Sequence, residues 1–503
     1  MGAASATAAV ELEDIQGLVR FAYKRHTEAV FLLLRVTDRV AARAWLARAV
    51  ITNAVTREPA PSTALQVALT SGGLRALGVA DDIIESFSSE FVEGMAGDPS
   101  RSRRLGDEGA SDPTRWQWGW GSGERMPHVA VLLYALPGLL HGLQQTIEAQ
   151  LRAGFEITGR LTTSNLGGTE PFGFVDGISQ PELDWSRRRP AGDVMQRSYL
   201  NLSCLGEYLL GYPNEYGLYT PRPLLEPHRD PQGILLRAED APGSCDVGRN
   251  GSYLVLRQLR QDVPGFWQAL DRYAGGVASR REQLASAMVG RKLDGQPLVA
   301  LQSSAAAAGD DPQASLNAFD YRSDPQGLRC PLGAHIRRAN PRNADLPPGG
   351  NGLVSTLVRI LGFDSHAREQ DLVASTRFHR LLRRGREYGT GVTPSQALTG
   401  AGAGEDRGLH FLCLGANLQR QFEFVQDAWL MSAKFDGMRE ESDPLLGNRL
   451  PLGSAMPTDR FSAAQPNGPS QRLTGLPQFV TVLGGAYFFL PGIRALRYLS
   501  SAT

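Results

Sequence analysis

The sequence predicts a mixed fold in which β-strands alternate with α-helices. Short apolar runs with high β propensity recur along the chain, and several are followed by a stretch with helical periodicity. The length of 503 residues fits two or three domains of about 150 residues each. With 42% hydrophobic and 21% charged residues, the chain has the composition of a globular protein that buries sizeable cores.

Three strand and helix pairs are expected in the first third of the chain. Each apolar run precedes a segment with helical features: 29–36 before the alanine-rich 37–55, 66–69 before 70–78, and 128–136 before 138–154. The segment that follows the second run begins with Thr70 and Ser71, which are good helix caps. This part of the chain therefore alternates strands and helices.

The later part repeats this architecture on a larger scale. Three further strands are predicted at 252–259, 409–415 and 479–490, and helix-like segments lie at 262–276 and 424–431. The sequence contains no repeat of fixed period, so any duplication between the two parts would be structural only.

Charge and cysteine content exclude several classes of function. The 52 basic residues balance the 52 acidic residues, so no global field favours nucleic acid or an anionic membrane as a partner. The four cysteines form no CxxC pair, which favours neither a disulfide scaffold nor a zinc site and fits a reducing, cytoplasmic location. The uncharged stretches 126–147 and 473–493 contain Pro, Gly or polar residues, so we expect buried core and no transmembrane span.

Asp176 is the first candidate for chemistry. It lies within GGTEPFGFVDGISQP, residues 167–181. An Asp-Gly pair is common in turns, where the carboxylate simply accepts backbone hydrogen bonds. The apolar neighbours Phe172, Phe174 and Ile178 favour a second interpretation, in which burial raises the pKa of Asp176 toward values useful in acid-base catalysis.

Two basic segments supply the other candidates. His335 lies in CPLGAHIRRANPR, residues 330–342; a lone histidine is usually structural, but imidazole is also the commonest haem ligand in proteins. Arg342 and its neighbours at 337 and 338 suit carboxylate groups, or form a solvated basic face. Arg383, in FHRLLRRGREYG, follows two leucines and is expected to point inward, either as a functional cation or in a structural salt bridge.

Together these three segments resemble the dye-decolourising peroxidases, a family of haem enzymes, and in particular its larger bacterial and fungal branch. The similarity covers nearly the whole chain and includes GEYLLGYPNEYG (206–217), NGSYLVLRQL (250–259), RGLHFLCLGANLQRQFEFVQ (407–426) and GGAYFFLP (484–491). The resemblance implies an α+β fold of two ferredoxin-like domains, each an antiparallel four-stranded sheet with peripheral helices, with haem between them. We place the boundary near residue 165, which gives domains 1–165 and 166–503.

The resemblance also implies roles for individual residues. His335 would be the axial ligand of one haem b per chain, and Arg342 and Arg383 would contact the cofactor. Asp176 and Arg383 would be the catalytic pair that acts on hydrogen peroxide. Glu423 is the candidate acceptor for the second ring nitrogen of His335, although an outward-facing position is equally compatible with its neighbours.

Bulky donors would pass electrons through an aromatic residue at the surface. Tyr388 is the first candidate and Trp429 the second, although most aromatic residues serve in packing. Cys330 lies close to His335 in sequence, but a haem-thiolate loop is absent around it, which disfavours a thiolate ligand.

The function that the resemblance implies is a peroxidase. It would use hydrogen peroxide to oxidise aromatic dyes and phenolic compounds in one-electron steps through a ferryl intermediate. The alternative is a haem carrier or iron-release protein of the same fold, which needs the axial ligand but not the pair Asp176 and Arg383. The sequence leaves the oligomeric state open, including a homo-oligomer.

Overall fold

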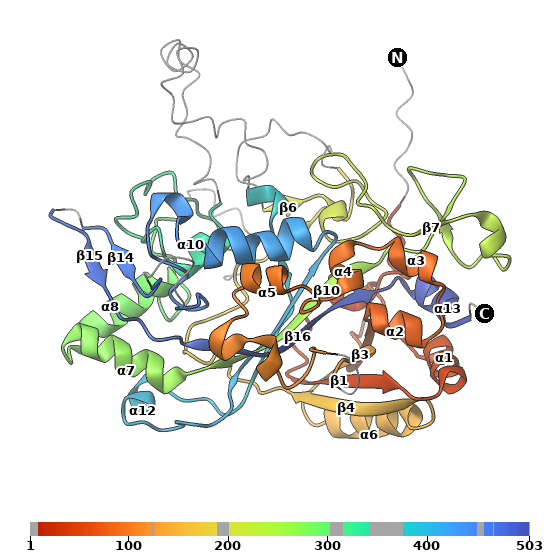
Figure 1. The fold of residues 1–503 in the computed structure, drawn as a ribbon, viewed down its shortest axis with the longest axis horizontal. Coiled ribbons are helices and arrows are strands. Elements are labelled where there is room, and N and C mark those ends of the chain that lie inside the picture. The colour runs from red at the N-terminus through yellow and green to blue at the C-terminus, as the bar shows by residue number, and fades with distance from the viewer. Residues whose placement is uncertain are drawn as a thin grey trace, which may run out of the picture.

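One antiparallel sheet of nine strands runs through the molecule (Figure 1). The computed structural model describes residues 9–121, 125–188, 201–301, 315–342, 376–449, 457–465 and 467–501. The sheet order is β11-β13-β10-β16-β2-β3-β1-β4, and β12 also pairs with β13. The strands are β1 (Glu28–Val36), β2 (Thr63–Leu69), β3 (Val129–Ala135), β4 (Phe155–Thr162), β10 (Ser252–Gln261), β11 (Leu382–Arg383), β12 (Arg386–Tyr388), β13 (Gly408–Gly415) and β16 (Val480–Leu490).

The sheet consists of two runs of strands with the same relative order. Numbered along the chain within each run, both β2-β3-β1-β4 and β11/β12-β13-β10-β16 read 2-3-1-4. The runs join edge to edge where β16 pairs with β2, with Phe489 opposite Leu69. The α+β class is therefore confirmed, but the expectation of two separate four-stranded sheets is wrong, because backbone pairing continues from one run into the other. The division at residue 165 stays a prediction.

Apolar side chains cover both faces of the sheet. In β1, Leu32 and Leu34 belong to one hydrophobic core, whereas Phe31 and Leu33 belong to the core on the opposite face. This alternation follows from the two-residue period of a strand, and it explains why the run 29–36 is almost continuously apolar.

Helices flank the sheet at both ends and on its faces (Figure 1). Asp38 caps the first helix by accepting a hydrogen bond from the N–H of Ala41, and Thr70 caps the second through the N–H of Gly73. The first helix ends at Arg48, so it is shorter than the predicted stretch 37–55. The α-helices are α1 (Arg39–Arg48), α2 (Ser71–Ala76), α3 (Asp81–Glu85), α4 (Ser89–Glu93), α5 (Pro99–Leu105), α6 (Leu140–Leu151), α7 (Val263–Ala274), α8 (Ala278–Val289), α10 (His335–Ala339), α12 (Pro394–Leu398) and α13 (Ile493–Ser501).

Shorter elements complete the described chain. The segment expected to be helical near residue 424 forms the π-helices η9 (Gln419–Glu423) and η10 (Val425–Met431). The 3-10 helices are η1 (Gly17–Val19), η2 (Gly109–Ser111), η3 (Pro113–Arg115), η4 (Leu205–Glu207), η5 (Pro227–Arg229), η8 (Thr376–Phe378) and η11 (Phe435–Gly437). Three small sheets contain β5 (Glu182–Leu183) with β6 (Leu202–Ser203), β7 (Leu224–Leu225) and β8 (Leu236–Arg237) with β9 (Cys245–Asp246), and β14 (Phe461–Ala463) with β15 (Gln471–Leu473).

The two long uncharged stretches lie inside the fold. The stretch 126–147 contains β3 and part of α6, and the stretch 473–493 contains β16. Within the residues that the structure describes, no helix has the length and apolar character needed to cross a membrane.

The segment 105–119 ties the N-terminal run of strands to the C-terminal run. The N–H of Gln117 donates to the carbonyl oxygen of Leu483 in β16 at 2.7 Å. The indole N–H of Trp118 donates to Oε1 of Gln258 in β10 at 2.9 Å. Gly119 follows with φ of 86° and lies against the backbone of Gly485.

Gly119→Ala is expected to weaken this junction. A Cβ at this position would lie 2.0 Å from the carbonyl oxygen of Gly485, and the left-handed φ adds its own cost. We expect a loss of about 2 kcal/mol or more in the free energy of unfolding, measured by thermal or denaturant unfolding. Gly121→Ala is the matched control, because φ there is 77° but a Cβ would have nothing within 4 Å. Equal losses in the two variants would contradict the importance of the close approach.

Candidate functional site

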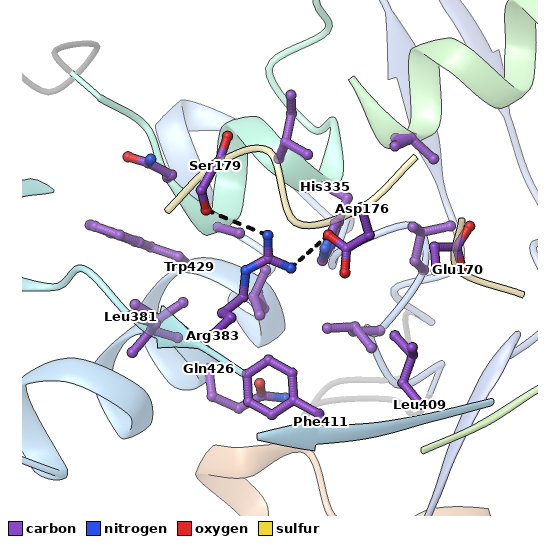
Figure 2. A pocket seen from close by; sticks show the side chains of 18 of the residues that line it. Glu170, Asp176, Ser179, His335, Leu381, Arg383, Leu409, Phe411, Gln426 and Trp429 are labelled. Atoms are coloured by element: carbon purple, nitrogen blue, oxygen red, sulfur yellow. Dashed lines mark hydrogen bonds and ion pairs between the residues drawn. The ribbon is translucent and has the colours of Figure 1, made fainter. Parts of the chain in front are cut away.

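A cavity of about 260 Å³ opens beside the C-terminal run of strands. Its walls come from the loop 170–181, from β10, β13 and β16, from α10 and from η10 (Figure 2). The lining is largely apolar, and it includes Leu409 and Phe411 of β13. His335, Asp176, Arg342, Arg383 and Trp429, which the sequence singled out, all line this cavity.

Glu170 fixes the loop that carries Asp176. Its carboxylate accepts hydrogen bonds from the backbone N–H groups of Phe172 and Phe174, both at 3.0 Å. The amide of Gln261 in β10 donates to the same carboxylate at 2.8 Å. These bonds anchor the loop to the sheet immediately before Asp176. Glu170 lies within the motif at 167–181, but it was not among the residues predicted to be functional.

Asp176 and Arg383 form an ion pair inside the cavity. Nη1 of Arg383 lies 2.9 Å from Oδ1 of Asp176, and Nη2 donates to the carbonyl oxygen of Ser179 at 3.5 Å (Figure 2). The backbone N–H of Arg383 donates to Oε1 of Gln180 at 3.0 Å, while β11 pairs with β13. The loop and the strand are thus joined at three points, and the Arg383 side chain lies in the wall of the cavity.

The pKa of Asp176 shifts in the direction opposite to the one predicted. Burial alone would raise this pKa, but the Arg383 guanidinium and the backbone N–H of Gly177 hold it below its ordinary value. The apolar neighbours suggested the wrong direction because a permanent cation, distant in sequence, lies within hydrogen-bond reach. Asp176 is therefore ionised at neutral pH.

His335 begins α10 and is oriented by Asp443. Its Nδ1 lies 2.9 Å from Oδ2 of Asp443, and a carboxylate can only accept, so Nδ1 carries the proton. The other oxygen of Asp443 accepts the backbone N–H groups of Leu445 and Leu446. Burial alone would lower the pKa of His335, but Asp443 raises it overall. Nε2 is the ring nitrogen left for a metal.

The predicted partner of His335, Glu423, is wrong. Glu423 ends η9 and lies 2.9 Å from Nε of Arg101, while the hydroxyl of Tyr487 donates to it at 2.9 Å. The π-helix directs this carboxylate toward α5, where a buried arginine requires a countercharge. The signal for Asp443 in the sequence is weak, namely an Asp-Pro pair before two leucines.

The cavity contains more positive than negative side chains. Five arginines and three carboxylates are part of its described lining: Arg257, Arg291, Arg342, Arg380, Arg383, Asp107, Glu170 and Asp176. Arg342 is buried and donates to the carbonyl oxygens of Asn317 and Phe319 at 2.9 and 2.8 Å. Arg337 and Arg338 point elsewhere, since they bind Asp324 and the backbone of η10, respectively.

Neither proposed electron-transfer residue lies at the surface. Tyr388 and Trp429 are each 6% exposed. Tyr388 stacks on His410 with ring centroids 4.5 Å apart, and its hydroxyl donates to Asp406 at 3.2 Å. Trp429 lines the cavity instead (Figure 2). The expected surface position is therefore wrong for both rings, because each packs against a histidine in the interior.

This donor set fits the haem that the sequence resemblance implies. A neutral imidazole with its second nitrogen fixed by a carboxylate is the usual arrangement for a metal-binding histidine. Apolar walls suit a porphyrin, and the excess of arginines suits its two propionates. Cys330 is buried and does not line the described cavity, which argues against a thiolate ligand.

Glu170→Gln is expected to flatten the pH dependence of stability. Burial raises the pKa of Glu170 from 4.5 to about 7, so the folded chain holds this proton more tightly than the unfolded chain does. The resulting stabilisation is complete below pH 4.5 and is lost as the pH rises to about 7. Thermal midpoints measured across this range should fall less in Glu170→Gln than in the parent chain. Glu282→Gln, an exposed position on α8, should keep the parental slope. Parallel profiles for Glu170→Gln and the parent would contradict the assigned pKa.

Comparisons with known proteins relate the chain to peroxidases in sequence and fold. No protein-family model matches the chain. A dye-decolorizing peroxidase of Mycetinis scorodonius is 27% identical over 535 residues, covering 99% of this chain and 89% of the relative. A multifunctional dye peroxidase of an Amycolatopsis species is 29% identical over 455 residues, covering 86% and 82%.

A solved structure gives the same fold. It is a dye-decolorizing peroxidase in complex with 2,6-dimethoxyphenol, and it superposes with a TM-score of 0.71 at 23% identity over 98% of this chain and 100% of that chain. The sequence similarity to the two relatives extends over most of both partners in each comparison. By homology along its length, this chain belongs to the DyP-type peroxidase family.

Proposed function

We propose that this protein is a haem-dependent peroxidase that uses hydrogen peroxide to oxidise phenolic compounds and bulky aromatic dyes in one-electron steps. The observation that carries the proposal is a single cavity lined by both a carboxylate-oriented imidazole and an arginine-carboxylate ion pair. Members of the family bind haem, and the two relatives compared above are peroxidases. The phenol bound by the structural neighbour supports a phenolic donor.

Three residues would hold the cofactor, and a fourth would tune it. In this proposal His335 would bind the iron of one haem b through Nε2, and Arg342 and Arg383 would bind its propionates. Asp443 would increase the basicity of the imidazole. When bound, haem iron supplies the redox chemistry that no side chain of the cavity offers.

Asp176 and Arg383 would perform the proton transfer that cleaves the peroxide bond. One carboxylate oxygen of Asp176 would accept a proton from one oxygen of hydrogen peroxide and return it to the other, which would depart as water. The bound haem would supply the two electrons for this cleavage and retain the remaining oxygen atom. This base must start ionised, and the low pKa of Asp176 meets that requirement even in mildly acidic solution. Arg383 is permanently charged, and its guanidinium stabilises the negative charge that develops on the departing oxygen.

The buried positions of Tyr388 and Trp429 change the proposal for bulky donors. Trp429 borders the cavity, so it would accept an electron within the protein rather than at the surface. Tyr388 stacks on His410, which points to the face of β13 opposite the cavity-lining Leu409 and Phe411. Trp429 would therefore act as the first internal step, and Tyr388 would receive an electron only across the sheet.

The cysteines support a reducing compartment. All four are buried, and burial raises the pKa of the Cys330 thiol to about 12. These thiols are unreactive and need no oxidising environment. We accordingly propose a cytoplasmic location.

Asp176→Asn and Arg383→Leu should each lower kcat/KM for peroxide-dependent dye oxidation, measured per bound haem, by about 100-fold or more. The reason is that the amide cannot accept the proton and leucine cannot stabilise the developing charge. Steady-state assays with one dye and one phenol measure the effect, and Glu282→Gln serves as the control for a carboxylate-to-amide change.

A carrier would behave differently in the same assays. If the parent chain binds haem in a 1:1 ratio but oxidises neither donor, or if the two variants match its activity, the assigned peroxidase function is wrong. The alternative of a haem carrier or iron-release protein would then remain.

His335→Ala should abolish stoichiometric haem binding, whereas Asp443→Asn should weaken it by about 10-fold to 100-fold. The neutral amide at position 443 attracts the Nδ1 proton less than the carboxylate does, so the imidazole becomes a weaker electron donor to iron. The ferric-ferrous reduction potential should therefore also rise. Haem titration monitored by absorbance, together with potentiometry, measures both effects.

Glu423→Gln is the control for this pair, because that carboxylate contacts Arg101 and Tyr487 instead of His335. Its haem affinity and potential should equal those of the parent. A shift in Glu423→Gln without one in Asp443→Asn would reverse the assignment.

A further inference from the structure

A second cavity lies in the N-terminal run of the fold, and it shares no lining residue with the cavity that contains Asp176. Its volume is about 1160 Å³. The loop 20–26, the C-terminal end of α1, the segment 49–57 and one side of α6 form its walls. We call it the N-terminal cleft. Nothing in the proposed peroxidase chemistry uses it.

The charge of the N-terminal cleft has one sign. No carboxylate belongs to its described lining. Five basic side chains line it: Arg20, Lys24, Arg25, Arg48 and Arg57. Such a bias is unexpected in a chain whose 52 basic residues balance 52 acidic ones. Clefts lined by charges of one sign concentrate ligands of the opposite sign.

The arginines of the cleft keep donors for a ligand. Arg20 uses Nη1 for the carbonyl oxygen of Ala54, and Arg48 uses Nε for the carbonyl oxygen of Ala44. Each guanidinium has five N–H donors, so one such bond leaves most of them unused. Arg25 and Arg57 are exposed and have no ion pair with any described carboxylate.

The same cleft has an apolar wall. Phe21, Ile51, Leu65, Leu143 and Ile147 contribute to it. Trp45 of α1 faces α6, and its indole N–H donates to Oε1 of Gln150 on that helix at 3.3 Å. Val50 borders the cleft and is 87% exposed, which adds accessible apolar surface to this wall.

We propose that the N-terminal cleft binds an amphipathic organic anion, with an aromatic body and a sulfonate or carboxylate group. The apolar wall would cover the ring system, and the arginines would bind the acidic group through charge-assisted hydrogen bonds. The concave shape fits a small molecule better than an extended polyanion or a flat membrane surface. This inference is independent of the peroxidase function, because it involves neither His335 nor Asp176.

The test uses 2-naphthalenesulfonate as the probe and the uncharged 2-naphthol as its matched analogue. Isothermal titration of the full haem-loaded chain should give one site for the sulfonate, with affinity at least about tenfold higher than for naphthol. The affinity should fall as salt is added, because the contact is between exposed charges. The fluorescence of Trp45 should change on binding, and Trp45→Phe identifies its share of the signal.

Arg25→Gln combined with Arg57→Gln should raise the Kd for the sulfonate by about tenfold or more. Arg272→Gln combined with Arg280→Gln removes the same charge from exposed positions on α7 and α8 and should leave the Kd unchanged. Arg383→Leu should also leave it unchanged, which separates this site from the Asp176 cavity.

Three results would overturn the proposal. They are equal affinity for naphthol and the sulfonate, a Kd insensitive to the two substitutions in the cleft, or loss of binding in Arg383→Leu. Sedimentation of the same variants covers a different occupant. If substitution at Arg25 and Arg57 dissociates an oligomer, the cleft is an interface between copies of this chain and not a ligand site.

Discussion

Buried charges must be paired, and this constraint determines where each functional side chain of the C-terminal run lies. Arg101 forms an ion pair with Glu423, Arg257 pairs with Asp107, and His335 pairs with Asp443. An unpaired charge in the interior would cost several kcal/mol, so the partners are not interchangeable. The pair of Asp176 and Arg383 is different, because it faces the cavity and its side chains are 42% and 31% exposed there.

The large sheet makes this pairing possible by holding distant segments in register. Asp176 and Arg383 are 207 residues apart in sequence. Arg383 is positioned because β11 pairs with β13, and Asp176 because Glu170 ties its loop to Gln261 of β10. Both anchors belong to adjacent strands of one sheet. The loop that carries Asp176 is therefore tied to strands of the sheet, which provides the precise positioning that reacting groups require.

Local patterns in the sequence identified six strands of the large sheet, because burial on both faces leaves a continuous apolar run such as 29–36 or 479–490. They missed the edge strand β4, whose alternate residues are exposed, and the short strands β11 and β12. They could not reveal that the two runs of strands form one sheet, since the junction is a single pair, Phe489 with Leu69. The same limit applies to the site. Motifs located Asp176 and Arg383. The partner of His335 could not be found in this way, because Arg101 of α5 binds Glu423 and leaves Asp443 for the histidine. The pKa of Asp176 was assigned the wrong direction because nearby residues in sequence were apolar and the decisive cation was remote.

The geometry also bears on the choice between a peroxidase and a haem carrier. A carrier needs an axial ligand and countercharges for the propionates, and His335 with the arginines of the cavity would suffice for both. Placing an ionised carboxylate in the same cavity costs desolvation, which must be offset by a dedicated cation, Arg383, and by the backbone N–H of Gly177. Holding that carboxylate with a dedicated loop anchor, Glu170, adds a second buried acid whose pKa is raised to about 7. Such costs are retained where a base must already be ionised and in place before its substrate arrives, which is the requirement of proton transfer on hydrogen peroxide.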